Sequence, residues 1–122
     1  DIFDQMHISP DTVFAALAHT TRLRCLILLV ENHELCVCEL THATGAAQPN
    51  ISRHLAHLRE AGLVSDRRDG LWIHYRINPG LPKWVKGVLK QTAKGVRDTP
   101  PFAEDLAALE TMANRPGATR CA

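Results

Sequence analysis

Two cysteines one residue apart form the most reactive part of the chain. Residues 34–40 read ELCVCEL, which places thiols at Cys36 and Cys38. A disulfide between such near neighbours would be strained, whereas two thiolates can share one soft, thiophilic ion. In a regular helix, positions two apart differ by about 200°. If the pair lies on a helix, we therefore expect ion binding to distort its first turn; incidental packing thiols are the plain alternative.

Length and composition restrict the class of protein. The 122 residues, 45% of them hydrophobic, suit one domain with a modest core. No apolar run approaches the ~18 residues that cross a bilayer, and no secretory pattern opens the chain, so we expect a soluble cytoplasmic protein with no membrane partner. In that reducing compartment the four cysteines should be free thiols, with Cys25 a buried small hydrophobe. The net charge of +1 means that attraction to nucleic acid must come from local clusters.

Helix signals dominate the first half of the chain. Ser9 is a capping residue before a first helix, and Thr20 opens an apolar second helix. A third helix is predicted over residues 35–44, where Gly45 ends it. A fourth helix follows over residues 48–62, with Ile51, Leu55 and Leu58 on one buried stripe.

A hairpin and two further helices complete the expected fold. Strands over residues 63–68 and 71–77 flank Asp69-Gly70, a dipeptide that favours a two-residue turn. An amphipathic helix follows over residues 83–97, and a short helix begins after Pro100-Pro101. We therefore predict a mainly α fold with a β-hairpin wing. Residues 1–99 would form the winged helix-turn-helix DNA-binding and dimerisation domain, and residues 100–122 a C-terminal helix and flexible tail.

The third and fourth helices match a helix-turn-helix, in which the second helix enters the major groove of DNA. The polar residues of the fourth helix outside its buried stripe are hydrogen-bonding types that address base edges and phosphates. Beside the hairpin turn, Arg67 and Arg68 would approach phosphates and add affinity more than sequence choice. An ordinary solvated helix face is the alternative. The candidate DNA-binding residues are Gln48, Asn50, Ser52, Arg53, His54, His57, Arg67 and Arg68.

Four segments in order resemble the ArsR family of winged-helix metalloregulators, and within it the arsenic-responsive repressors. These segments are ELCVCEL at 34–40, QPNISRHL at 48–55, LREAGLV at 58–64 and GLWIHYRI at 70–77, and the similarity runs over residues 14–86. The resemblance implies a homodimer, joined through its first and fifth helices, that represses an efflux operon and leaves double-stranded operator DNA when metal binds. By the same resemblance, Cys36 and Cys38 would bind the inducer, As(III) or Sb(III), and the fourth helix would read the operator.

The chain departs from the arsenic pattern at Thr41, where a third cysteine often stands. Cys121 could supply the third sulfur, or the inducer could be an organic arsenical that needs only two thiols. A Zn, Cd or Pb sensor is an alternative, because Cys38 and His42 could form a zinc-like set with Cys36 or Glu39. The fifth helix has no acidic or histidine ligand for an interhelical zinc site. A thiol-redox sensor of the same fold is a further alternative, whereas no paired acid and base or phosphate loop supports an enzyme.

Overall fold

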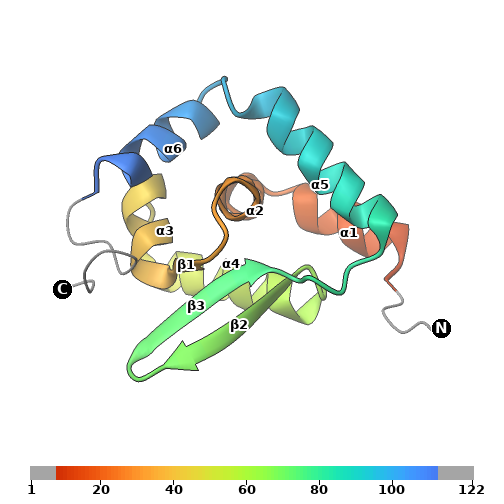
Figure 1. Ribbon diagram of the computed structural model, residues 1–122, viewed down its shortest axis with the longest axis horizontal. Helices are drawn as coiled ribbons and strands as arrows, with labels where there is room; N and C mark the ends of the chain where they lie inside the picture. Colours follow the sequence, from red (N-terminus) through yellow and green to blue (C-terminus); the bar gives the residue numbers. More distant parts are fainter. Residues whose placement is uncertain (1–7, 113–122) are drawn as a thin grey trace.

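The computed structural model describes residues 8–112, so predictions for Cys121 and the rest of the tail lie outside the described residues. Six helices and three strands follow one another in this part of the chain (Figure 1). The predicted mainly α architecture with a β-hairpin wing is confirmed. In chain order the elements are α1 Pro10–Leu17, α2 Thr20–Glu31, β1 Leu35–Cys36, α3 Val37–Thr44, α4 Gln48–Glu60, β2 Val64–Asp69, β3 Trp72–Ile77, α5 Lys83–Val96 and α6 Phe102–Glu110.

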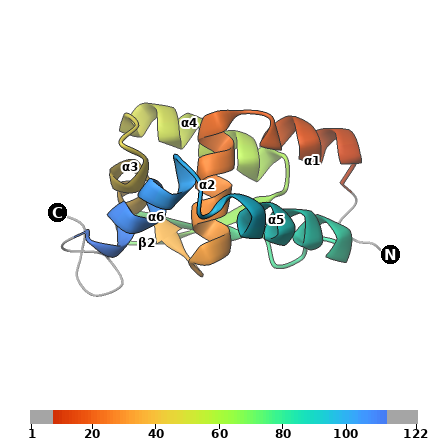
Figure 2. The same cartoon turned by 90° about the horizontal axis from the view of Figure 1, so that it is seen from above.

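Helix α2 is the centre of the fold. It contacts the five other helices and strand β3, and the remaining elements surround it in Figures 1 and 2. Residues 25–29 are all buried, which is more than one helical turn, so α2 has no solvated face along this stretch. Within residues 8–112 no single helix could span a membrane. Only α1 and α2 together have the required length and hydrophobicity, and the chain bends by 100° between them.

The helix starts follow the capping signals in the sequence. The Ser9 side chain accepts the backbone N–H of Thr12 at the start of α1. At the start of α2 the Nδ1 atom of His19 accepts the N–H of Thr21. Each contact satisfies a backbone donor that has no partner inside the helix. The predicted beginnings of both helices are therefore confirmed.

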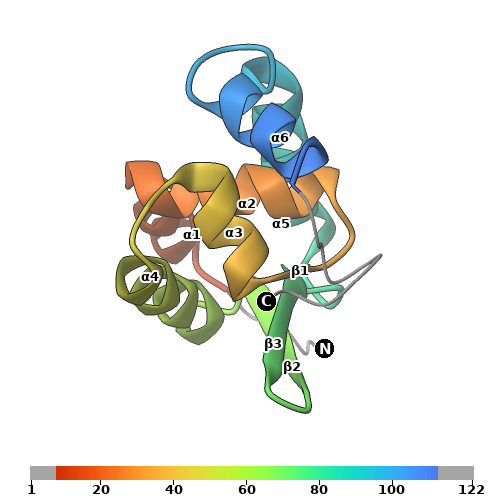
Figure 3. The same cartoon turned by 90° about the vertical axis from the view of Figure 1, so that its left-hand side faces the viewer.

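Three antiparallel strands form the sheet, in the order β1-β3-β2 (Figure 3). Cys36 of β1 pairs with His74 of β3, so the prediction that a helix begins at residue 35 is wrong by two residues. The hairpin turn also differs from the prediction by one residue. Asp69 pairs with Trp72, which leaves Gly70 and Leu71 in the turn, and the positive φ of 63° at Gly70 explains why a glycine stands there.

Helix α6 packs on α3 and α2. Its Leu109 is buried and belongs to the same hydrophobic cluster as Leu26, Leu28 and Leu40. The last described helix therefore covers α2 and α3, the latter being the first helix of the helix-turn-helix. It contributes to the single core of the described chain.

Candidate functional site

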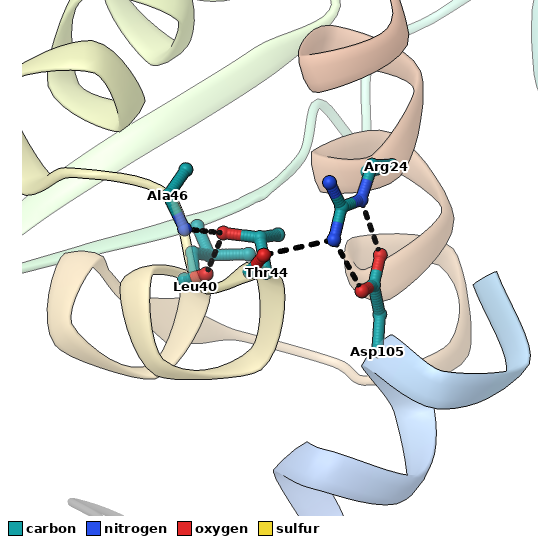
Figure 4. Close-up of polar contacts among 5 residues, drawn as sticks. All are labelled: Arg24, Leu40, Thr44, Ala46 and Asp105. Carbon is teal, nitrogen blue, oxygen red and sulfur yellow. Dashed lines mark hydrogen bonds and ion pairs between the residues drawn. The ribbon is translucent and has the colours of Figure 1, made fainter. Parts of the chain in front are cut away.

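The turn between α3 and α4 is held at the C-terminal end of α3 (Figure 4). Gly45 adopts a left-handed conformation with φ of 71° and donates its N–H to the Thr41 carbonyl, which ends α3. The guanidinium of Arg24, on α2, donates to the Thr44 carbonyl at 2.8 Å. This contact satisfies one of the carbonyls that a helix C-terminus leaves without a partner.

Arg24 is itself oriented by Asp105 of α6. The pair is bidentate, with Nε to Oδ2 at 2.8 Å and Nη2 to Oδ1 at 2.6 Å. Asp105 is only 3% exposed, and its hydrogen bond is the main reason that the pKa of Arg24 is raised. Three helices, α2, α3 and α6, thus meet at one charged contact. The sequence reasoning missed Asp105, because a pair separated by 81 positions has no local signal.

Most of the candidate DNA-reading residues lie on the outer face of α4. Gln48, Arg53 and His57 are exposed, and Asn50 and Ser52 are partly exposed. The amide of Gln48 lies 3.4 Å from the hydroxyl of Ser52, and Arg53 donates to the Asn50 side chain. These donors and acceptors are the types that read base edges. Their role in DNA binding stays a prediction.

His54 does not share this outer face, so its predicted exposure is wrong. The residue is 6% exposed, and its ring lies 4.2 Å from the ring of His19, centroid to centroid. Its Nδ1 atom is 3.4 Å from the guanidinium of Arg22. Burial, followed by the nearby cations, lowers the pKa of His54. The physical reason for its position is helical spacing, since His54 stands three residues after Ile51 on the buried side.

The two wing arginines differ in their surroundings. Arg67 forms a bidentate ion pair with Glu34, Nε to Oε2 at 2.9 Å and Nη2 to Oε1 at 2.7 Å. Arg68 is exposed on the same strand. Because Glu34 directly precedes β1, its ion pair with Arg67 connects β2 to the residue before the strand that contains Cys36. Contact of either arginine with phosphate remains a prediction.

The two sulfur atoms lie together at the start of α3. Cys36 is the N-cap of this helix and Cys38 lies in its first turn, and their Sγ atoms are 2.7 Å apart. Cys36 also forms a capping box with Glu39, whose carboxylate accepts the Cys36 N–H at 2.9 Å. The expectation that the helix must be distorted to bring the sulfurs together is therefore wrong. It assumed that both residues were helical, whereas Cys36 is extended with ψ of 167°.

The cysteines differ in protonation and bonding. Burial raises the pKa of Cys25 to about 12, which makes that thiol unreactive at neutral pH. Burial also raises the pKa of Cys36, so an ion that binds its sulfur must displace a proton. Cys38 is disulfide-bonded in the structure, and the expectation of four free thiols is wrong at this position. Ion binding by Cys38 requires the reduced protein.

One cavity connects the sulfur pair with the helix-turn-helix and the wing. Its volume is about 360 Å³, a size that accommodates a small ligand. The wing contributes mainly apolar side chains to the lining, and α4 contributes two polar ones. The lining residues are Cys36, Val37 and Cys38 from the start of α3, Gln48 and Ser52 from α4, and Leu71, Trp72, Ile73 and Tyr75 from the wing.

The zinc-like set expected at Cys38 and His42 is not assembled in the part of the chain that the structure describes. Among residues 8–112, no group of three or more His, Cys, Asp or Glu side chains is close enough to hold a metal ion. Binding of a soft ion by the sulfur pair stays a prediction. Sulfur ligands favour thiophilic ions over magnesium or calcium.

A reading helix reached by a glycine turn and followed by a β-hairpin defines a winged helix-turn-helix regulator of transcription. The family model for the bacterial regulatory proteins of the arsR family matches residues 19–66. The match covers α2 to the start of β2. With relatives that are 46% and 44% identical over 89% of the chain, this match shows that the chain belongs to the ArsR family and is a DNA-binding regulator, not an enzyme.

Curated relatives support this assignment over most of the chain. The arsenic resistance transcriptional regulator ArsR1 of Pseudomonas putida is 46% identical over 109 residues, which is 89% of this chain and 84% of that protein. The arsenical resistance operon repressor of Escherichia coli is 49% identical over 82 residues, or 67% of this chain and 70% of the repressor.

Solved structures share the fold. HlyU from Vibrio cholerae superimposes with a TM-score of 0.63 at 30% identity, covering 70% of this chain and 88% of HlyU. The winged helix-turn-helix domain of Mb0332 from Mycobacterium bovis, described as homodimeric, gives a TM-score of 0.58 at 33% identity. That match covers 71% of this chain and 76% of the domain.

Proposed function

We propose that the chain is an arsenic-responsive transcriptional repressor that binds operator DNA as a homodimer. Trivalent arsenic or antimony would bind Cys36 and Cys38 and release the DNA. The observation that carries the proposal is the cavity shared by the two sulfurs, by Gln48 and Ser52 of the reading helix, and by the wing. The names of the relatives from P. putida and E. coli support the same inducer class.

The position of the sulfur pair suggests how binding would reach the DNA-reading elements. Cys36 belongs to β1 and pairs with His74 of the wing, whereas Cys38 belongs to α3, which leads through Gly45 into α4. An ion held by both sulfurs would fix the wing relative to the helix-turn-helix. If that arrangement fits DNA poorly, the ion shifts the population away from the DNA-bound state.

The proposed homodimer uses a surface that is apolar and exposed. Phe14 of α1 is 53% exposed and Trp84 of α5 is 42% exposed. Both helices lie on the same side of α2 in Figures 1 and 2. Large exposed apolar side chains gathered on one side of a protein are typical of an interface. A second copy of the chain is the proposed occupant.

The test is arsenite-dependent release from DNA of the gene's own upstream region, measured by fluorescence anisotropy with phosphine-reduced protein. Cys36→Ser and Cys38→Ser should keep DNA affinity and raise the arsenite needed for release by about 100-fold or more, since each removes one thiolate ligand. Cys25→Ala is the matched control and should respond like the parent. Normal release from the Cys36→Ser/Cys38→Ser variant would disprove the sulfur assignment.

The identity of the inducer is a separate part of the proposal. Two sulfurs beside an apolar cavity suit a trivalent arsenical with an organic substituent, because its arsenic needs only two thiols. Phenylarsine oxide should therefore release DNA at or below the arsenite concentration that does so. If Cys121 is the third ligand for arsenite, Cys121→Ser should lower the sulfur count at arsenic from three to two by X-ray absorption. An unchanged count would assign the third sulfur elsewhere.

A thiol-redox-responsive repressor is the second candidate, and the disulfide at Cys38 is the observation that favours it. The two candidate functions predict opposite orders for arsenite and diamide in releasing DNA. A redox sensor should release DNA with diamide and rebind after reduction, and arsenite should have little effect on it. Release by arsenite in reduced protein, with no response to diamide, would exclude this candidate.

A further inference from the structure

A second cavity lies on another side of the molecule, between the end of α2, the end of β3 and the first half of α5. Its volume is about 330 Å³, within the range of small-molecule sites. It shares no lining residue with the cavity beside the sulfur pair. A ligand here would therefore not compete for the residues of the proposed inducer site.

The lining of this second cavity combines an apolar floor with basic groups. Leu29 and Leu89 are buried beneath it, and Val30, Ile77 and Pro79 complete the apolar part. The remaining lining residues are His33, Arg76, Lys86 and Lys90, and none is acidic. An apolar floor surrounded by donors of positive charge complements a ligand with an apolar body and an anionic head.

Four arginines of the described chain are already paired with carboxylates, unlike the cations of this cavity. Arg24, Arg59, Arg67 and Arg97 each form an ion pair with a carboxylate. Within residues 8–112, Arg76, Lys86 and Lys90 have no such pair. Their charge is therefore available to an external anion. Other described cations, such as Arg68 and Lys83, also have no carboxylate pair, but Arg76, Lys86 and Lys90 share one cavity with an apolar floor.

The cavity can stay open when the proposed dimer forms. Lys86 stands two residues after Trp84 on α5, about 200° around the helix, and Lys90 about 240° around it. The buried residues Val85, Leu89 and Ala93 separate the two flanks. A partner that covers the Trp84 flank thus leaves the lysine flank accessible.

We propose that this cavity binds an amphipathic organic anion, namely an aromatic or short-chain aliphatic carboxylate or sulfonate. The apolar body lies on Leu29, Ile77 and Leu89, and the anionic head lies among Arg76, Lys86 and Lys90. The site goes beyond the proposed metalloid response and would act as a second input to the same regulator.

The test uses the full reduced chain and three naphthalene probes of similar size: 1-naphthoate, neutral naphthalenemethanol and the cation naphthylmethylammonium. Calorimetry should show that the carboxylate binds at least about tenfold more tightly than the other two. In methyl-region NMR spectra, 1-naphthoate should shift resonances of Leu29, Ile77 and Leu89. Equal affinity for the three probes would overturn the proposal.

Variants separate the two halves of the site. K86Q/K90Q should weaken 1-naphthoate binding by about tenfold, whereas K83Q/K94Q, which neutralises two exposed lysines of the same helix outside the cavity, should not. Val30→Phe should fill the half-buried apolar side and also weaken binding, with an unchanged melting curve as the folding control. Equal losses in both lysine pairs would refute the site. So would an absence of naphthoate binding combined with a loss of DNA affinity in K86Q/K90Q alone, because the cations would then contact phosphate.

Discussion

The two ends of helix α3 are held in different ways. At its C-terminus, Arg24 and the buried Asp105 fix the Thr44 carbonyl through a bidentate ion pair. At its N-terminus, the Cys36 and Cys38 sulfurs lie beside a cavity, and the ion pair of Arg67 with Glu34, just before β1, is more exposed than the Arg24–Asp105 pair. The C-terminal end of α3 is held by contacts among three helices, whereas its N-terminal end borders the cavity of the proposed inducer site.

This difference separates the part of the protein that must stay constant from the part that can respond. Removing one partner of a buried bidentate pair greatly lowers the free energy of unfolding, because the other charge stays desolvated. An exposed pair exchanges its partner at little cost. In the proposed mechanism, an ion at the sulfurs would therefore act on the start of α3 and on the wing, while the turn into α4 keeps its geometry.

Breaking the ion pair of Arg24 with Asp105, which holds the C-terminal end of α3, should have the largest effect. Asp105→Asn leaves Arg24 partly buried without its carboxylate, and we expect a loss of about 2–3 kcal/mol in the free energy of unfolding, measured by urea denaturation. Asp66→Asn, which breaks the more exposed pair with Arg59, is the control and should lose less than about 1 kcal/mol. Similar losses in the two variants would show that the two ends of α3 do not differ as described.

Strengthening the open end should have the next largest effect. Thr41 follows Cys38 by three positions on the same helix face, and its buried hydroxyl has no hydrogen-bond partner among the described residues. Thr41→Cys should lower the arsenite concentration for DNA release by about tenfold, because it adds a third sulfur without losing a hydrogen bond. Thr41→Val keeps the shape but adds no ligand. An equal gain in the valine variant would mean that packing, not ligation, is responsible.

Releasing the wing arginine should have a smaller effect. Glu34→Gln removes the charge that holds Arg67, so the guanidinium becomes available to phosphate. Affinity should rise a few-fold on operator and random DNA alike, and the salt dependence should steepen by about one phosphate contact. Arg67→Ala should change the slope in the opposite direction. Glu31→Gln, which frees Arg97 on α5, is the control, and an identical change there would contradict the assignment to the wing.

The smallest effect is the pH dependence of stability that comes from His54, on the buried side of α4. The folded-state pKa of His54 lies below its ordinary value of 6.5, because burial and the neighbouring cations disfavour its charged form. As the pH falls through 6.5, the unfolded chain takes up a proton that the folded chain resists, so this residue lowers stability in acid and has no effect above neutrality. Urea unfolding at pH 7.5 and 5.5 should show a smaller pH difference in His54→Gln than in the parent. Equal differences would exclude His54 as the cause.

Much of the fold follows from local patterns. Ser9, Gly45 and the hydrophobic spacing of α4 and α5 determine helix starts, ends and buried sides, and these predictions agree with the structure. The burial of His54 also had a signal, since positions 51, 54, 55 and 58 share one helical face. Its polarity led to the opposite prediction. For His54, the helical spacing and not the polarity of the side chain determines which side of α4 it occupies.

Other features had no local signal. Leu35–Cys36 is a strand only because β3 of the wing lies beside it, and two residues are too few to show an alternating pattern. Asp105 is buried because Arg24 meets it across the fold, although most aspartates are exposed. The sequence could identify the sulfur pair, but not the cavity that joins it to the reading helix, because that cavity is formed by three separate segments.

The contact of Arg24 and Asp105 with the end of α3 also affects how such a protein can evolve. Arg24 and Asp105 hold the turn from inside the molecule, so the outward residues Asn50 and Arg53 contribute little to its geometry. Substitutions on that outer face can be tried one at a time without loss of the fold. A duplicated copy of the gene could therefore acquire a new operator while keeping its inducer, which is how one sensor design can come to serve several promoters.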